Sequence, residues 1–248
     1  MEWLNLNNSV SSNIPVVVLC GGRGTRMGSE DVPKPMFKIG TRPILWHIMK
    51  IYESFGFKNF ILLLGYKKEK IIKYFKNHKG WNIEFVDTGL DTNTAGRIKK
   101  IESFIKSDLF LVTYGDGLSD LNLQKLIDFH LRHKKIATLT SVRPYSQFGI
   151  MSINSHTNLV THFKEKPLLD HWINGGFFVF NREVFKYIKE DDILEKDTLI
   201  RLSKDKQLVA YKHQGFWMCM DTYKDNLLLN QLWNSKNVPW APWHRKAL

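Results

Sequence analysis

The stretch Pro15-Val-Val-Val-Leu-Cys-Gly-Gly-Arg-Gly-Thr-Arg26 decides the fold, because a short apolar run passes directly into a glycine-rich loop. Such a run is typical of a strand buried in a parallel sheet. Glycines lack Cβ, so their backbone N–H groups can wrap around a phosphate, and an N–H-rich turn favours anions. The stretch therefore predicts a first strand whose carboxyl end carries a phosphate-binding loop.

This loop differs from the two most familiar phosphate-binding motifs. It lacks the Gly-Lys-Ser/Thr of a P-loop and the third glycine of a dinucleotide fingerprint. It carries Arg23 and Arg26 instead, and an arginine beside a phosphate can stabilise charge that develops on phosphorus. Further along, Pro33 and Pro35 restrict the backbone on both sides of Lys34 and can aim its amine inward. A plain glycine-rich turn is the competing interpretation.

Segments of strand and helix character alternate as far as Val142. The pattern predicts strands at Phe60–Leu64, Ile83–Val86, Leu109–Thr113 and Ala137–Val142, and helices at 44–55, 67–75 and 123–133. This alternation predicts an α/β, Rossmann-like fold, with a mostly parallel central sheet flanked by helices. After Phe148 the rhythm changes, and we expect a small antiparallel addition to the same sheet from extended runs at Gly149–Ile153, Leu159–Phe163 and Gly176–Phe180.

The bulk properties indicate one soluble domain. The length of 248 residues suits a single large α/β domain, which we expect over residues 14–248 after a flexible leader at 1–13. The leader lacks the features of a signal peptide, and no apolar run has the length of a bilayer span. Cys20 and Cys219 form no disulfide framework or metal-binding pattern, which favours the cytoplasm.

The formal charge of +12 raises the question of nucleic-acid binding. The lysines are spread along the chain and form no sustained basic block. A solvated lysine-rich surface is therefore the favoured interpretation, with part of the excess serving polyanionic small molecules. We expect no nucleic-acid partner and no membrane partner.

Two carboxylates are candidates for holding a metal ion. Tyr114-Gly-Asp-Gly117 follows the fourth predicted strand. Ligands of open α/β sheets bind outside the carboxyl ends of the strands, so Asp116 is expected at the same edge as the glycine-rich loop. Mg²⁺ takes one or two protein carboxylates together with phosphate oxygens, and Asp221 is the candidate for the second. A simple Asp-Gly turn is the competing interpretation.

A third group of residues has the character of an acceptor site. Lys164-Glu-Lys-Pro167 is followed by Asn174-Gly-Gly176. A lysine in a rigid turn can hold a phosphate, and a nearby glutamate can accept hydrogen bonds from hydroxyls or an amine, although a solvated turn is the competing interpretation. No nucleophile elbow, Cys/His signature or histidine metal spacing is present. This fits a reaction in which one phosphate attacks the α-phosphorus of another without an enzyme nucleophile.

Taken in order, the motifs Gly-Gly-x-Gly-Thr-Arg, Pro-Lys-Pro, Gly-Asp-Gly, Glu-Lys-Pro, Asn-Gly-Gly and Met-Asp-Thr resemble those of the sugar-phosphate nucleotidyltransferases, collinearly from Val16 to Trp243. Several stretches are closest to the glucose-1-phosphate cytidylyltransferase branch: Pro43–Met49, Val86–Gly89, Thr94–Arg97, Thr113–Gly117, Gly175–Val179 and Gly215–Trp217. The chain departs from that branch in lacking its long insertion between Tyr74 and Trp81, in a shorter Gly28–Val32 stretch, and in Ala95, where a glycine is expected.

The resemblance implies a CTP-dependent cytidylyltransferase with Mg²⁺ as cofactor. The implied catalytic residues are Arg26, Lys34 and Asp116, and the implied metal ligands are Asp116 and Asp221. The implied nucleotide-binding residues are Gly21, Gly22, Arg23, Gly24, Thr25, Arg26, Thr94, Gly96, Arg97 and Asp116. The implied acceptor-binding residues are Gly149, Glu165, Lys166, Asn174 and Gly175.

The reaction implied is transfer of CMP from CTP to a small phosphorylated acceptor with release of pyrophosphate. A sugar 1-phosphate similar to glucose 1-phosphate, used for surface polysaccharide, is the favoured acceptor. A non-sugar phosphate such as L-glutamine phosphate, used in capsule modification, is the alternative. A non-catalytic nucleotide-binding regulator is the alternative from another class. Because the missing insertion is linked to subunit assembly in that branch, the sequence does not decide whether the chain forms a homo-oligomer.

Overall fold

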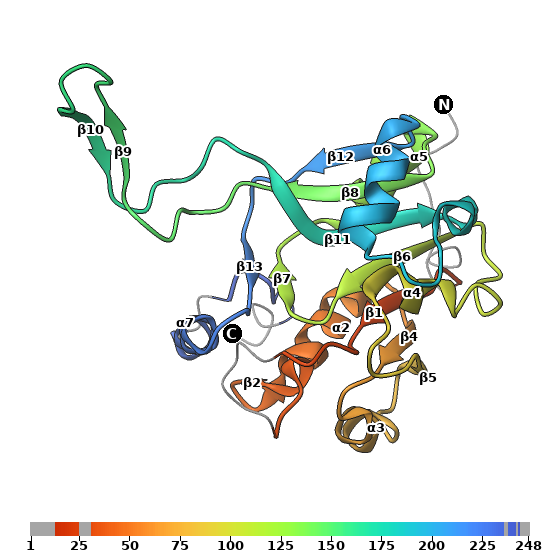
Figure 1. The fold of residues 1–248 in the computed structure, drawn as a ribbon. Coiled ribbons are helices and arrows are strands. Elements are labelled where there is room, and N and C mark those ends of the chain that lie inside the picture. Colours follow the sequence, from red (N-terminus) through yellow and green to blue (C-terminus); the bar gives the residue numbers. More distant parts are fainter. Residues whose placement is uncertain (1–12, 25–30, 236–237, 242, 244–248) are drawn as a thin grey trace, which may run out of the picture.

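A seven-stranded, mostly parallel sheet forms the centre of the computed structural model, which describes residues 13–24, 31–235, 238–241 and 243 (Figure 1). The strands lie in the order β12 (Leu208–Lys212), β8 (Ala137–Val142), β11 (Ile173–Asn181), β6 (Leu109–Tyr114), β1 (Val16–Leu19), β4 (Asn59–Leu64) and β5 (Asn82–Asp87). β1 runs parallel to β4 and β6, β4 parallel to β5, and β12 parallel to β8, whereas β11 is antiparallel to both its neighbours. The predicted fold class is confirmed.

Helices cover both faces of this sheet. They are α2 (Ile44–Ser54), α3 (Lys68–Phe75), α4 (Thr94–Lys99), α5 (Leu123–His133), α6 (Leu199–Lys204) and α7 (Tyr223–Asn234), with short 3₁₀ or π-helical segments at η2 (Lys34–Met36), η3 (Arg182–Tyr187) and η4 (Leu194–Thr198). All four residues of β1 are buried, and they alternate between two apolar clusters. One cluster contains residues of α2 and α5, and the other contains residues of α4 and α6. Burial on both faces explains the unbroken apolar run of β1.

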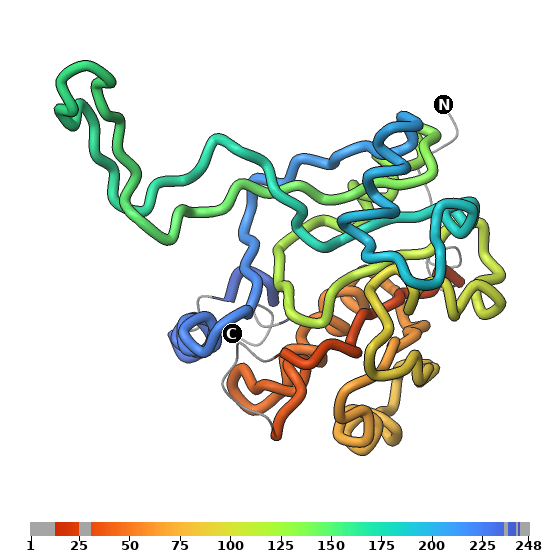
Figure 2. Tube along the Cα trace, in the orientation of Figure 1, coloured from red at the N-terminus to blue at the C-terminus, as the bar shows by residue number. Residues whose placement is uncertain are grey.

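A long hairpin, which we call the arm, projects from the body (Figures 1 and 2). It consists of β9 (Ile150–Ile153) and β10 (Val160–Lys164), and every residue of both strands is exposed. The expectation that all three late extended runs join the central sheet is therefore right for β11 and wrong for the arm. The reason lies in the pairing, since β8 already has β11 and β12 as neighbours and offers β9 no free edge.

Two further small sheets flank the body. β7 (Gly117–Ser119) pairs antiparallel with β13 (Trp217–Cys219), and β2 (Lys38–Ile39) pairs with β3 (Arg42–Pro43). Among the described residues, no helix combines the length and apolarity that crossing a bilayer requires. The predicted leader lies outside the described residues apart from Asn13.

Candidate active site

A cavity of about 440 Å³ opens at the carboxyl ends of β1 and β6. Its lining residues are Leu19, Cys20, Gly21, Gly22, Gly24, Lys34, Pro35, Thr92, Asn93, Thr94, Arg97, Tyr114, Gly115, Asp116 and Ile193. The glycine-rich loop and Asp116 thus share one edge of the sheet, as the strand pattern predicts. We call this cavity the nucleotide cavity, because most of the residues expected to bind the nucleotide line it.

A partly buried ammonium group joins the two carboxylates that we expected to hold a metal. Lys34 Nζ donates to Asp116 Oδ2 at 2.7 Å and to Asp221 Oδ1 at 2.7 Å. The side chains are 13%, 21% and 31% exposed, respectively. Burial by itself lowers the pKa of Lys34, but the charge of Asp116 and the hydrogen bonds to both aspartates raise it above its usual value. Lys34 therefore keeps its positive charge between the two carboxylates.

The β7–β13 ladder brings Asp116 and Asp221 together. Cys219 lies opposite Gly117, and the next residue, Met220, donates its N–H to the carbonyl of Asp116 at 2.8 Å. Asp221 then donates its N–H to Asp225 Oδ2 at 3.0 Å. Its neighbour Thr222 caps α7 in a capping box with Asp225. Asp221 is thus fixed between a ladder and a helix start.

Lys34 is positioned by the chain on either side of it. Pro33 has φ −65° and ψ 144°, and Lys34 begins the short η2 turn with Pro35 next to it. Gly24 has φ +61°, and a Cβ at that position would lie 2.7 Å from Lys34 Cβ. A side chain at Gly24 would therefore be both strained and in collision with the lysine. The end of the described glycine loop packs directly against Lys34.

Arg97 ties together the ends of three parallel strands. Its Nη1 donates to Leu64 O at 3.0 Å, Thr88 Oγ1 at 2.6 Å and Gly89 O at 2.7 Å. Its Nη2 donates to Gly21 O at 3.2 Å and Leu90 O at 3.1 Å. The residue is 4% exposed. Although it lines the nucleotide cavity, its donors are directed at the protein, so it fixes the segments that follow β1, β4 and β5.

A glutamate that the sequence analysis did not single out joins α4 to β6. Tyr114 donates its hydroxyl to Glu195 Oε1, and Thr94 Oγ1 donates to Glu195 Oε2 at 3.3 Å. Burial, followed by the charge of Glu195, raises the pKa of Tyr114, which keeps the hydroxyl protonated. Glu195 lies in η4, a π-helical turn without the periodicity that predicts a helix.

Two other residues expected to bind the nucleotide, Arg23 and Gly96, do not line the nucleotide cavity. A Cβ on Gly96 would lie 2.0 Å from Glu190 O, so Gly96 packs against the chain before η4. Arg23 Nη2 forms an exposed ion pair with Asp91 at 2.9 Å. Thr25 and Arg26 lie outside the described residues.

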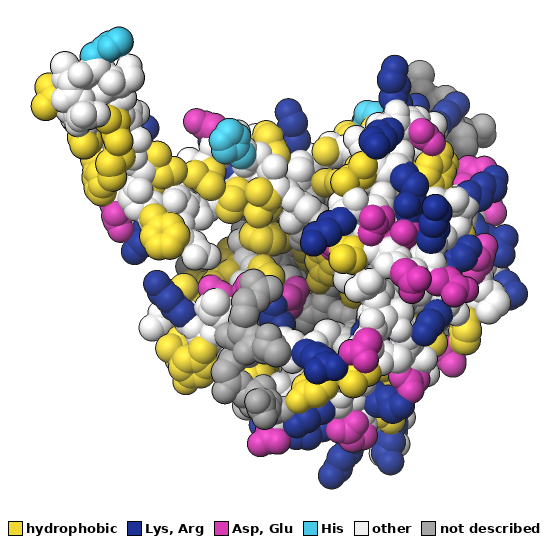
Figure 3. All heavy atoms as spheres, in the orientation of Figure 1, with side chains coloured by type: hydrophobic (Ala, Val, Ile, Leu, Met, Phe, Trp, Pro, Cys, Tyr) yellow, Lys and Arg dark blue, Asp and Glu magenta, His cyan; other side chains and the backbone are white. Residues whose placement is uncertain are grey.

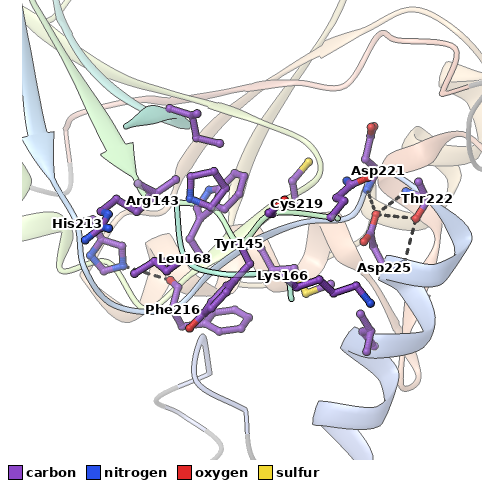
Figure 4. Close-up of a pocket in the computed structure, with 18 of the residues that line it drawn as sticks. Arg143, Tyr145, Lys166, Leu168, His213, Phe216, Cys219, Asp221, Thr222 and Asp225 are labelled. Carbon is purple, nitrogen blue, oxygen red and sulfur yellow. Dashed lines mark hydrogen bonds between the residues drawn. The ribbon is translucent and has the colours of Figure 1, made fainter. Parts of the chain in front are cut away.

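A second cavity, of about 1380 Å³, lies between the base of the arm, β13 and the start of α7 (Figure 4). It belongs to the hollow visible between the arm and the body (Figure 3). Its lining includes Lys166, Asp221 and Cys219, together with Phe216 and Trp217. Because Asp221 lines this cavity and Asp116 lines the nucleotide cavity, the Lys34 ion pairs connect the two. We call it the acceptor cavity, because Lys166, one of the residues expected to bind the acceptor, lines it.

The five residues expected to bind the acceptor fall into two groups. A Cβ on Gly149 would lie 3.0 Å from Glu165 Oε2 at the base of the arm, and Glu165 pairs with Lys166 at 3.4 Å. Of these three, Lys166 lines the acceptor cavity. The remaining two lie on β11, where Asn174 donates to the Tyr114 hydroxyl at 3.3 Å and Gly175 O accepts from Trp217 Nε1 at 2.7 Å.

Several residues that line the acceptor cavity were not predicted. They include Arg143, Tyr145, Phe148, His213 and Phe216. His213 Nε2 lies 3.0 Å from Asp120 Oδ1. Phe216 belongs to the Gly-Phe-Trp motif that carried part of the resemblance, so a signal for it existed. The others come from loops without a pattern that marks them.

The thiols near the ion pairs are poor nucleophiles. Burial, followed by the charge of Asp116, raises the pKa of Cys219 to about 12 and also raises the pKa of Cys20. Thiols with raised pKa values stay protonated at neutral pH and react slowly. The site therefore suits direct transfer between two bound phosphates better than covalent catalysis by cysteine.

Comparison with known proteins identifies the class to which this site belongs. The chain belongs to the nucleotidyl transferase family, which matches residues 15–229. It is 43% identical to the probable glucose-1-phosphate cytidylyltransferase of Bacillus subtilis, with 92% of this chain and 99% of that protein covered. It is 41% identical to the glucose-1-phosphate cytidylyltransferase of Salmonella typhimurium, with 92% and 98% covered. Among solved structures, HddC from Yersinia pseudotuberculosis matches with a TM-score of 0.71 and 25% identity, over 89% of this chain and 99% of that one.

Proposed function

We propose that this enzyme transfers CMP from CTP to a sugar 1-phosphate, with glucose 1-phosphate as the first candidate, and releases pyrophosphate. The observation that carries the proposal is the Lys34–Asp116–Asp221 group between a glycine-lined cavity and a larger polar and aromatic one. The two relatives that bear this activity in their names cover nearly all of the chain. Both lines of support point to the same reaction.

In this proposal, the triphosphate of CTP lies in the nucleotide cavity. The backbone of Gly21, Gly22 and Gly24 faces its oxygens, and Lys34 supplies a positive charge beside them. The residues around Thr94 and Arg97 form the end that receives the base. Arg26 is proposed to stabilise the transition state from the same loop.

The acceptor lies in the larger cavity, where Lys166 offers a cation for its phosphate. An oxygen of that phosphate attacks the α-phosphorus of CTP in line. The new P–O bond joins CMP to the acceptor, and the bond to the pyrophosphate leaving group breaks. No enzyme nucleophile takes part, so catalysis consists of positioning and of charge stabilisation.

Asp116 and Asp221 are the residues proposed to hold Mg²⁺. Among the described residues, no three side chains of His, Cys, Asp or Glu gather in a metal-binding cluster. Two carboxylates around one cation position nevertheless fit Mg²⁺, which completes its octahedron with phosphate oxygens and water. When bound, the ion would neutralise charge on the triphosphate.

We further propose that a second copy of this chain covers the arm. Its exposed apolar side chains include Ile153, Leu159, Val160 and Phe163, each more than half exposed. A two-stranded hairpin is marginal on its own, and exposed apolar patches mark interaction sites. Light scattering after size exclusion is expected to show an oligomer that the double substitution Leu159→Asp/Phe163→Asp dissociates. A wild-type monomer contradicts this part of the proposal.

The test of the activity is a pyrophosphate-release screen. Each of CTP, UTP, ATP and GTP is combined with Mg²⁺ and with each of several acceptors, including glucose 1-phosphate and L-glutamine phosphate. Release only with CTP and a sugar 1-phosphate is expected. Release only with the amino-acid phosphate refutes the acceptor. If no combination releases pyrophosphate, CMP transfer is refuted and the alternative of a non-catalytic nucleotide-binding regulator is favoured. We place the reaction in the cytoplasm, in the supply of sugar nucleotides for surface polysaccharide.

A further inference from the structure

The ammonium of Lys34 occupies the position that a divalent cation needs. Its Nζ lies 2.7 Å from one oxygen of each carboxylate, in a place that is largely shielded from water. The three residues come from segments far apart in the sequence, and separate local structures hold them: η2, the β6–β7 turn and the start of α7. Their convergence on one point is thus built into the fold.

A metal ion and this ammonium exclude each other at that point. Mg²⁺ binds carboxylate oxygens at about 2.0–2.1 Å, so an ion shared by Asp116 and Asp221 at the point where Nζ lies would overlap with the nitrogen. An ammonium has three donors and no lone pair, so it cannot serve as a ligand itself. Two cations between the same carboxylates would also repel each other at short range in a partly buried site. The entry of a metal at that point therefore requires Lys34 Nζ to leave.

The structure also provides a destination for Nζ. Lys34 lines the nucleotide cavity beside Gly21 and Gly22, the proposed triphosphate loop. Its four-carbon stem is flexible and lets the ammonium move while the backbone stays between Pro33 and Pro35. A triphosphate bound there would offer oxygens in place of the two aspartates.

We propose that Lys34 is an exchangeable counter-ion that occupies the cation position of the nucleotide-free enzyme and gives it up to a divalent metal when a triphosphate accepts its ammonium. The inference rests on the proposed function for the identity of the triphosphate. Its consequence is thermodynamic coupling, because each ligand then raises the affinity of the other. The free enzyme binds metal weakly, and metal and nucleotide enter together.

The test measures Mn²⁺ binding to the enzyme without any nucleotide, by electron paramagnetic resonance of the free ion. Lys34→Met removes the competing ammonium, and we expect it to bind Mn²⁺ about tenfold more tightly than wild type or better, within the usual range of site coupling. Lys34→Gln, which keeps a polar group, should shift affinity in the same direction. Lys38→Met, which removes an exposed lysine nearby, should leave affinity unchanged. The double variant Lys34→Met/Asp221→Asn should lose the gain in Mn²⁺ affinity, because one of the two proposed metal ligands is removed.

Equal or weaker Mn²⁺ binding by both Lys34 variants, with circular dichroism matching wild type, overturns the exchange. So does an equal gain in Lys38→Met, which would mark a general charge effect. Since no nucleotide or turnover enters this measurement, its failure is separable from failure of the proposed function. Absence of CMP transfer by the wild-type enzyme would refute the reaction, and tightened Mn²⁺ binding by Lys34→Met would still support the exchange.

Discussion

The clearest structural perturbation of the site is the substitution Arg97→Met. Methionine keeps an apolar stem but removes the five hydrogen bonds of the guanidinium. Two of the acceptors keep other donors: Leu64 O accepts from Thr88, and Gly21 O accepts from the N–H of Tyr66 at 3.2 Å. The carbonyls of Gly89 and Leu90 lose the donors that Arg97 supplies.

The expected loss of stability follows from these two carbonyls. Hydrogen bonds from a charged donor contribute about 1.5–3 kcal/mol each, and water can replace part of this at Gly89 and Leu90, which are not fully buried, so the variant should lose about 3 kcal/mol. For a domain of this size, that loss lowers Tm by about 6–12 °C. Arg97→Lys should recover only part of it, because one ammonium cannot serve the ends of three strands.

The Tm is measured by differential scanning calorimetry. The affinity for CTP is measured by isothermal titration calorimetry at a temperature below the unfolding transition. The control is Arg132→Met, which removes an exposed arginine from α5 and should stay within about 0.5 kcal/mol of wild type. A variant Arg97→Met with wild-type Tm and strongly weakened CTP binding would refute the reasoning. Arg97 would then be a direct nucleotide contact and not the residue that holds the cavity walls.

Three other changes have defined outcomes. Asp116→Asn should lower kcat for pyrophosphate release by about 10²-fold or more, because charge stabilisation at the triphosphate is lost; near-normal turnover contradicts this. Gly21→Ala places a Cβ 2.1 Å from Arg97 Nη1 and should lower the free energy of unfolding by about 1–3 kcal/mol, measured by chemical denaturation. Gly22→Ala should leave stability unchanged, because nothing lies within 4 Å of its Cβ. Equal stability of the two variants would show that the collision at Gly21 is relieved. Burial lowers the pKa of His47 to about 4 from 6.5, so the unfolded chain binds a proton that the folded one does not, and stability should fall by about 2 kcal/mol between pH 7 and pH 5. His47→Gln should remove that part of the pH dependence, and an unchanged slope in urea denaturation would contradict it.

The sequence predicted the elements that carry strong periodicity. The apolar run before Gly21 forms β1, and the helix expected at 44–55 is observed as α2, Ile44–Ser54. Parallel strands place their carboxyl ends at one edge, so the proximity of Asp116 to the glycine loop followed from strand order alone. These features depend on local pattern and on general rules of topology.

The remaining features depend on long-range packing. The arm could not be predicted, because Gly149–Ile153 has the composition of a sheet strand and its exposure depends on which neighbours β8 has already taken. The direction of the Arg97 side chain is decided by carbonyls at three separate strand ends, which no spacing in the sequence reveals. The same holds for Lys34, since a lysine between prolines shows nothing about the two aspartates that meet it.

The most direct test of the central claim is a competition in one vessel. The enzyme is given CTP, UTP, ATP and GTP at equal concentrations, with Mg²⁺, glucose 1-phosphate and L-glutamine phosphate, and the products are identified by mass spectrometry. Asp116→Asn in a parallel vessel controls for contaminating activity. The account predicts CDP-glucose as the dominant product, absent or strongly reduced with Asp116→Asn. A dominant product with another nucleotide, a CDP-linked glutamine product, or no sugar nucleotide at all would contradict it.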